Sequence, residues 1–244
     1  MTPKKERIDR LLVERGLFDS RAKAQAAIEA GLVKADERPV HKASEEVAVD
    51  SAITAAPAHP YVSRGGLKLA AALDQFAFDP KGRVCLDVGA STGGFTEVLL
   101  ERGARRIYAV DVGHGQLHQS LRERPQVVSL EETDIRKMSP AAMRETPDLI
   151  VVDVSFISLK QVLPAALKLV AHRTELVALI KPQFEAGPVY VKKGIVRDAS
   201  VHKAVRDDIA GFVASLGWRV LGIFPSPIAG GDGNAEFLLG AVRD

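Results

Sequence analysis

Four residues with side chains suited to proton transfer lie at separate points of the sequence: Lys68, Asp153, Lys181 and Glu236. A hydroxyl group that accepts a transferred group needs a base to remove its proton, or a positive charge to balance the developing alkoxide. Two lysines close together disfavour each other's charged form, so that one of them can act as a neutral base. The set therefore predicts transfer to a hydroxyl, with Lys181 as the base or, alternatively, as a charged stabiliser of the alkoxide.

The positions of these residues predict their roles. Asp153 and Lys181 each end an apolar run, at 149–153 and directly after 176–180. The carboxyl ends of neighbouring strands line the ligand crevice of a doubly wound sheet, so we expect these two side chains to converge there. Lys68 and Asp153 would then steer the protonation of Lys181 and position the hydroxyl. Glu236 could form a salt bridge with one of the lysines and so hold them in place.

A glycine-rich segment, LDVGASTGGF at 86–95, follows an apolar run and opens a helical pattern. Glycines in such a turn let a ligand approach the backbone, and the helix N-terminus offers free amide groups. Ser91 stands where a dinucleotide fingerprint requires glycine, and Asp87 suits a cationic ligand better than a diphosphate. The segment predicts S-adenosylmethionine as cofactor, bound by Asp87, Gly89, Ser91, Gly93, Gly94 and Phe95.

Two further acids follow the next apolar runs and extend the predicted cofactor site. Asp111 is expected to accept hydrogen bonds from the ribose hydroxyls, and Asp134 is expected to meet the adenine amino group. A helix cap or a surface position is the alternative for Asp134. Phe95 and Phe156 are candidates to stack on the adenine or on a flipped target base, and core positions are the alternative for both.

Apolar runs alternate with helical stretches from Tyr61 onward, after a first helix that carries Arg64 and Lys68. The runs lie at 84–88, 107–111, 127–130, 149–153, 176–180, 219–224 and 237–242. This alternation predicts an α/β fold of the Rossmann-like type, a mostly parallel seven-stranded sheet with helices on both faces. Because no helical pattern separates the last two runs, we expect them to form an antiparallel hairpin.

The first 60 residues have a different organisation. Short amphipathic helices are predicted before Gly16 and over 22–29, the second capped by Ser20, with strands at 32–34 and 46–50. Residues 1–23 hold seven basic against four acidic side chains, whereas residues 24–60 hold three against six. The composition of residues 55–60 is typical of a linker. We therefore predict one domain at 1–60 and a second at 61–244.

The segment RIDRLLVERGLFDSRAKAQAAIEAGLVKADERPV resembles the S-four-type RNA-binding domain. The resemblance implies that Arg7, Arg21 and Lys23 contact RNA phosphates. An ordinary solvated helical hairpin is the alternative. Further basic residues, next to the predicted crevice, are candidates for RNA contacts or for plain solvated charge: Arg64, Lys192, Lys193 and Arg197.

The order Lys68, Asp153, Lys181, Glu236 matches the catalytic tetrad of the FtsJ-type 2′-O-ribose methyltransferases. The surrounding segments VSRGGLKL, DVGASTGGFTEVLL, VDVSFISL, KPQFEAG, GIVRD and GNAEFLL resemble one branch of them, the TlyA family. The resemblance implies S-adenosylmethionine-dependent methylation of a cytidine ribose in ribosomal RNA, in the large subunit and for some members also in the small one. Ribosomal RNA within subunits is the partner it implies.

Composition narrows the alternatives. The formal charge of +2 indicates no partner by itself, and the single Cys85 excludes an intramolecular disulfide framework. His114 and His118 lack a third ligand at metal spacing, so no metal site is predicted. No apolar run reaches about 18 residues, which predicts a cytoplasmic protein outside the membrane. Some TlyA relatives are named haemolysins, so a membrane-active protein is one alternative, and a non-catalytic RNA-binding protein is another.

Overall fold

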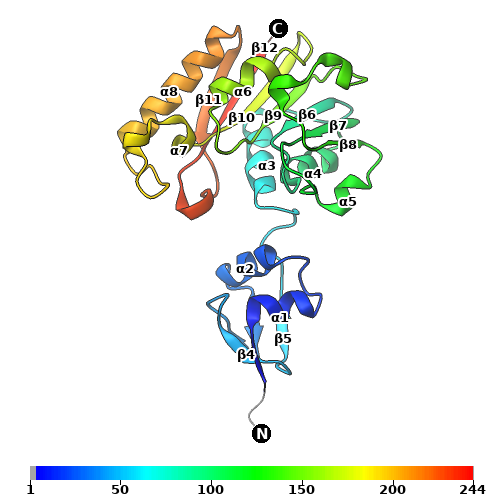
Figure 1. The fold of residues 1–244 in the computed structure, drawn as a ribbon, viewed down its shortest axis with the longest axis vertical. Helices are drawn as coiled ribbons and strands as arrows, with labels where there is room; N and C mark the ends of the chain where they lie inside the picture. Colours follow the sequence, from blue (N-terminus) through cyan, green and yellow to red (C-terminus); the bar gives the residue numbers. More distant parts are fainter. Residues whose placement is uncertain (1–3, 244) are drawn as a thin grey trace. The chain divides into compact units, whose positions relative to one another are not determined.

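The computed structural model describes residues 4–243. The chain divides into two compact units, Met1–Pro60 and Tyr61–Asp244, which are described separately (Figure 1). Within residues 4–243, no helix is both long and apolar enough to cross a membrane.

The N-terminal unit is a small α+β module in which two helices cover short antiparallel strands. Its apolar core includes Ile8, Leu12 and Ile28. β1 pairs with β4, and β2 pairs with both β3 and β5. The elements are β1 (Lys5–Arg7), α1 (Ile8–Glu14), α2 (Arg21–Glu29), β2 (Val33–Ala35), β3 (Arg38–Pro39), β4 (Glu46–Ala48) and β5 (Ile53–Ala55).

Both helices expected in this unit are present. The Ser20 hydroxyl accepts a hydrogen bond from the Lys23 amide and caps α2, and the chain leaves α2 through Gly31 with a positive φ of 71°. The strands were predicted less completely, since β1, β3 and β5 are only two or three residues long. β5 includes Ala55, the first residue of the predicted linker, which pairs with Val33.

The second unit is built on one seven-stranded sheet with the order β11-β12-β10-β9-β6-β7-β8. Neighbouring strands from β10 to β8 run parallel, whereas β12 is antiparallel to both β10 and β11. The predicted mostly parallel sheet and its final antiparallel hairpin are thus confirmed. The strands are β6 (Val84–Val88), β7 (Arg106–Val110), β8 (Val127–Leu130), β9 (Leu149–Val152), β10 (Thr174–Ile180), β11 (Arg219–Pro225) and β12 (Phe237–Arg243).

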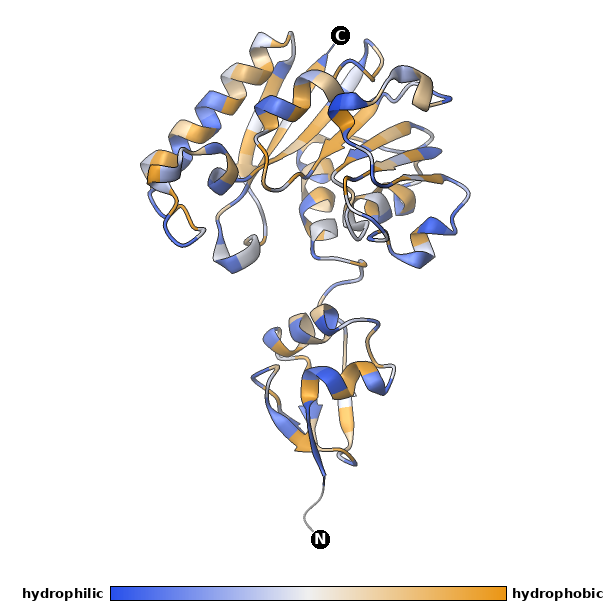
Figure 2. Cartoon of the chain, viewed as in Figure 1, coloured by the Kyte–Doolittle hydropathy of each residue, from blue (hydrophilic) through white to orange (hydrophobic). Residues whose placement is uncertain are grey.

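Helices cover both faces of this sheet, because successive strand residues point to opposite sides. Ile150 and Val152 pack with α6 and α8, whereas Leu149 and Val151 pack with α3, α4 and α5. Figure 2 shows the sheet strands as largely hydrophobic, as expected for strands buried on both faces. The helices are α3 (Gly65–Phe76), α4 (Gly94–Glu101), α5 (Gln119–Arg122), α6 (Leu159–Ala166), α7 (Pro182–Glu185) and α8 (Ala199–Ser215).

The crossing from β8 to β9 differs from the expected helix. It contains only the short 3₁₀ turns η1 (Ile135–Lys137) and η2 (Pro140–Ala142). Pro140 and Pro147 interrupt this segment, and proline disfavours a helix interior because it lacks an amide hydrogen and its ring clashes with the preceding turn. Other 3₁₀ turns are η3 (Pro188–Tyr190), after α7, and η4 (Gly231–Gly233), between β11 and β12.

Candidate functional site

A cavity of about 460 Å³ opens at the carboxyl ends of the central parallel strands. This is the edge at which ligands bind in open α/β sheets. Gly89 and Ser91 line it after β6, Asp111 after β7, and Asp153 after β9. The remaining lining residues are Val88, Val110, Val112, Gln116, Thr133, Asp134, Ile135, Arg136, Val154, Ser155, Phe156, Ile157 and Val162. The cavity therefore has apolar walls with carboxylates along its rim.

The glycine-rich segment forms one wall, but its residues do not all reach the cavity. Gly89 has a φ of +85°, and a Cβ there would clash with the carbonyl oxygen of Asp153. A Cβ on Gly94 would collide with Ser63, so this glycine lets α4 pack closely on the segment before α3. Phe95 is 3% exposed and belongs to the core. Gly93, Gly94 and Phe95 are absent from the cavity lining.

Asp87 lies inside β6 and is completely buried. Its Oδ2 accepts a hydrogen bond of 2.6 Å from the Thr96 hydroxyl, and its Oδ1 has no hydrogen-bond partner among the described residues. Burial raises the pKa of Asp87 to about 7, and the negative charges of Asp153 and Asp111 act in the same direction. A nearby cation would favour the ionised form of this carboxyl.

Asp111 and Asp134 both line the cavity, and both already accept hydrogen bonds from the protein. The backbone amides of Ser91 and Gly113 donate to the two oxygens of Asp111, at 2.8 and 2.7 Å. Since a carboxylate has about four acceptor sites, about two remain for a ligand. Asp134 caps η1 and binds the guanidinium of Arg136, which lowers the pKa of Asp134 to about 2. Asp134 is thus a helix cap that also borders the cavity.

The four residues predicted to act in proton transfer form two ion pairs. Lys181 Nζ lies 2.6 Å from Asp153 Oδ1, and Lys68 pairs with Glu236. Ile180 pairs with Phe237 across the antiparallel β10–β12 ladder. Lys181 directly follows Ile180 and Glu236 directly precedes Phe237, so both stand at the same end of this ladder. The side chains of both lysines are only 10% exposed.

Only one of the two lysines pairs with Glu236. Glu236 contacts Lys68, and no ion pair joins it to Lys181 among the described residues. Lys181 instead donates a hydrogen bond of 2.8 Å to the Ser155 hydroxyl, a partner that the sequence analysis missed. The spacing of Ser155, two residues after Asp153, was the available signal. Each buried lysine is therefore neutralised by one carboxylate, and Lys181 is oriented by a second, neutral partner.

Comparison with known proteins agrees with this arrangement. Residues 61–243 match the family described as FtsJ-like methyltransferase, and residues 6–53 match the S4 domain. The chain belongs to the FtsJ-like methyltransferase family. A Bacillus subtilis relative named "Putative rRNA methyltransferase YqxC" is 48% identical over 243 residues, covering 98% of this chain and 86% of that protein.

A second relative places the chain in the TlyA branch of this family, and a solved structure is similar over the whole chain. "16S/23S rRNA (cytidine-2'-O)-methyltransferase TlyA" of Mycobacterium tuberculosis is 44% identical over 239 residues, covering 97% of this chain and 89% of that protein. A solved structure titled "Putative hemolysin from Streptococcus thermophilus" superposes with a TM-score of 0.79 at 41% identity, covering 100% of this chain and 90% of that one. The predicted family is confirmed.

In this methyltransferase unit, the other predicted residues are exposed. Phe156 is 90% exposed, lines the cavity, and packs against Phe184 with ring centroids 5.0 Å apart. Arg64 stands at the start of α3. Lys192 and Lys193 lie in a tight turn closed by the Lys192–Ile195 bridge. Within residues 4–243, no group of three metal-ligating side chains is present.

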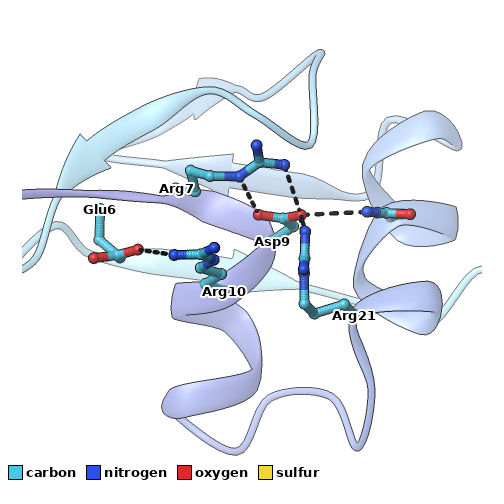
Figure 3. A network of polar contacts seen from close by, with 6 residues as sticks. Glu6, Arg7, Asp9, Arg10 and Arg21 are labelled. Atoms are coloured by element: carbon cyan, nitrogen blue, oxygen red, sulfur yellow. Dashed lines mark hydrogen bonds and ion pairs between the residues drawn. The ribbon is translucent and has the colours of Figure 1, made fainter.

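In the S4 unit, the three predicted basic residues all make ion pairs. Lys23 pairs with Asp19 one helical turn earlier, at 2.9 Å. Arg7 and Arg21 both pair with Asp9, at 3.0 and 2.7 Å (Figure 3). Asp9 is completely buried and escaped the sequence analysis, although it stands between the apolar residues of α1 and beside basic ones. The basic surface of this unit is therefore organised around a buried acid.

Proposed function

We propose that this chain transfers the methyl group of S-adenosylmethionine to the ribose 2′-hydroxyl of a cytidine in ribosomal RNA, within ribosomal subunits of the cytoplasm. The observation that carries the proposal is the Lys181–Asp153 pair at the cavity that follows the glycine-rich segment. The substrate is inferred from rRNA methyltransferases that are similar to this chain over nearly its whole length. The large subunit is the expected substrate, with the small subunit as a second one.

The cavity fits S-adenosylmethionine in size and chemistry. Its volume of about 460 Å³ lies in the usual range for small-molecule sites. Asp111 has acceptor capacity left for the ribose hydroxyls, and the apolar Val112 and Ile135 suit an adenine ring. The buried, unpaired Oδ1 of Asp87 favours a positively charged ligand nearby. The cofactor supplies an electrophilic methyl group on a cationic sulfur.

The two lysines are proposed to have different roles in the reaction. Lys181 Nζ is held by Asp153 and Ser155, which fixes its position next to the cavity. It can give a proton to Asp153, so that the neutral amine then takes the proton of the 2′-hydroxyl, or it can remain charged and stabilise the alkoxide. Lys68 is balanced by Glu236 and keeps the local charge near neutral. Phe156 offers an exposed ring at the mouth of the cavity for stacking on the target base.

A direct test is methyl transfer to unmodified ribosomal subunits, followed by mass measurement of RNA fragments. The expected result is one methyl group added to a cytidine ribose in the large subunit. No transfer to either subunit would overturn the proposal, and lysis of erythrocytes by the same preparation would favour a membrane-active function. Transfer to a base instead of a ribose would leave the enzyme class intact but contradict the assigned acceptor.

The role of Lys181 is tested by Lys181→Ala. We expect a loss of about 10²- to 10⁴-fold in the rate of transfer, as for removal of a general base or an electrostatic stabiliser. Cofactor affinity, measured by calorimetry, should change little. The matched control is Lys203→Ala, which removes a lysine that is 70% exposed on α8 and pairs with Asp207. A rate near that of the unsubstituted enzyme for Lys181→Ala would show that another group takes the proton.

A further inference from the structure

The S4 unit contains one carboxylate that is shared by several donors. Asp9 is 0% exposed and lies in the first turn of α1. Arg7 donates to it through Nε and Nη2, at 3.1 and 3.0 Å, and Arg21 does so through the same two atoms, at 3.2 and 2.7 Å. Gln25 adds a hydrogen bond of 3.2 Å to Oδ2. Figure 3 shows the two guanidiniums converging on the Asp9 carboxylate from different elements.

Each arginine uses only one edge of its guanidinium in this cluster. The Nη1 group and the outer N–H of Nη2 of Arg7 and Arg21 make no hydrogen bond among the described residues. The side chains of Arg7 and Arg21 are 38% and 49% exposed, so these free edges can meet solvent. A guanidinium edge binds phosphate oxygens through two parallel hydrogen bonds. The cluster carries two positive charges against one negative charge.

We propose that Asp9 is a positioning residue for RNA binding: it fixes Arg7 and Arg21 beside each other with their free edges outward, as a clamp for RNA backbone phosphate. This inference rests on the proposed function, in which the S4 unit binds ribosomal RNA. Long arginine side chains lose conformational freedom when they bind, and a carboxylate that orders them beforehand removes that cost. Asp9 thus acts through the arginines without touching the RNA.

The proposal opposes the expectation from net charge. Asp9→Asn removes one negative charge next to a surface that binds a polyanion, so charge alone predicts tighter binding. Positioning predicts weaker binding, because asparagine carries no negative charge and has a donor NH2 group in place of one of the two oxygens that hold the guanidiniums. The sign of the change separates the two explanations.

The experiment measures binding of the full chain to large ribosomal subunits that lack the methyl group. We expect Asp9→Asn to bind about 10-fold more weakly, since ordering each freed arginine costs a factor on the order of 3. In a chain that already carries Arg7→Ala and Arg21→Ala, Asp9→Asn should cause no further loss. The matched control is Glu6→Gln, which also removes one negative charge but frees only Arg10 from a pair at 3.8 Å, and it should leave affinity unchanged or slightly raise it.

Equal or tighter binding by Asp9→Asn, with weaker binding by the double arginine variant, would overturn the proposal. Asp9→Asn could also weaken binding by unfolding the S4 unit, which hydrogen exchange of residues 4–60 would detect. A second variant tests the proposal in that case. Arg21→Lys keeps the charge and leaves Asp9 with Arg7 and Gln25, yet cannot form the two-atom contact. Positioning predicts a loss close to that of Arg21→Ala, and affinity like that of the unsubstituted chain would contradict it. Failure of the unsubstituted chain itself to bind or methylate subunits would instead overturn the proposed function.

Discussion

Among residues 4–243, each unit buries one aspartate completely, and the two aspartates have opposite electrostatic properties. Asp9 of the S4 unit accepts hydrogen bonds from Arg7, which holds its pKa well below the usual range, with Arg21 adding to the effect. Asp87 of the methyltransferase unit is buried among apolar residues with one hydroxyl partner, and burial raises its pKa to about 7. Burial alone therefore does not decide whether a carboxyl is charged; the neighbouring cations do.

The difference fits the two kinds of ligand proposed. The S4 unit has a permanently charged cluster with open edges, as binding of a polyanion requires. The methyltransferase unit keeps Asp87 without a cation of its own, next to a site proposed for a cationic cofactor. A third buried acid, Glu236, has a single lysine partner and stands between these cases. We therefore expect the contributions of the three acids to unfolding free energy to differ in size and in the direction of their pH dependence.

The largest effect is expected where a buried pair is broken. Glu236→Gln leaves the ammonium of Lys68, whose side chain is 10% exposed, without a carboxylate. Removing one partner of a buried pair costs about 3–5 kcal/mol of unfolding free energy. Urea unfolding followed by hydrogen exchange in residues 61–243 measures this loss.

The matched control is Asp207→Asn, which breaks the Lys203–Asp207 pair on α8, with side chains 70% and 62% exposed. This exposed pair should contribute less than about 1 kcal/mol. Replacing Lys68 and Glu236 together by Met and Leu should recover much of the loss, since no buried charge is then unpaired. Equal costs for Glu236→Gln and Asp207→Asn would contradict the assignment of Lys68 and Glu236 as a buried pair.

Asp87 predicts an unusual pH dependence of the methyltransferase unit. Because its folded pKa of about 7 exceeds the ordinary value of 3.8, the native state binds the proton more tightly than the unfolded state does. Its contribution to unfolding free energy therefore falls as the pH rises from about 4 to about 7, and is level above that. Between about pH 5 and about pH 8 the loss is about 3 kcal/mol.

Comparison with Asp87→Asn isolates this contribution, because all other groups titrate in both proteins. Asparagine can still accept the hydrogen bond from Thr96. We expect the variant to gain stability relative to the unsubstituted chain as the pH rises, measured by urea unfolding without cofactor. A difference between the two that stays constant with pH would show that Asp87 is already ionised in the native state.

The sequence predicted the strands of the methyltransferase unit well, because buried parallel strands are continuous apolar runs. β6 and β8 begin and end at the predicted residues. The sequence also predicted that Asp153 and Lys181 lie at the carboxyl ends of neighbouring strands, here β9 and β10, and hence at one edge of the sheet. The partners of the lysines depend on side-chain directions from α3 and from the segment before β12, which no local pattern records. For that reason the sequence left open which lysine pairs with Glu236, and the contact of Lys181 with Ser155 was found only in the structure.

Asp9 shows a second reason why the sequence did not predict a functional residue. Sequence counting treats an acid among basic residues on a short helix as solvated charge. Its burial depends on α2 packing across α1, which brings Arg21 and Gln25 to it from residues far along the chain. The same packing changes the meaning of the predicted RNA contacts Arg7 and Arg21, since both are bound on one edge.

The smallest effect is expected from acidification of the S4 unit. Because the pKa of Asp9 is lowered by Arg7 and Arg21, the stability that it contributes is present above the ordinary value of 3.8 and is lost as the pH falls below it. The side chains of Arg7 and Arg21 are 38% and 49% exposed, so solvent screening limits the loss to the order of 1 kcal/mol. Amide exchange of Ile28 and Leu12 in the core of this unit, compared at about pH 5 and about pH 3, measures it.

Asp9→Asn should remove this acid sensitivity, whereas Glu6→Gln should retain it. Over the range in which the S4 unit loses protection on acidification, the Asp87 contribution changes in the opposite direction. From about pH 5 to about pH 3 it rises by roughly 1 to 2 kcal/mol, and it becomes level only below the ordinary value of 3.8, where the unfolded state also binds the proton. One titration of the full chain thus separates the two buried aspartates: protection of the S4 core falls toward low pH, and the Asp87 contribution to the methyltransferase unit falls toward neutral pH. A fall of both toward low pH, with no difference between Asp87→Asn and the unsubstituted chain, would mean that the two burial sites are electrostatically alike.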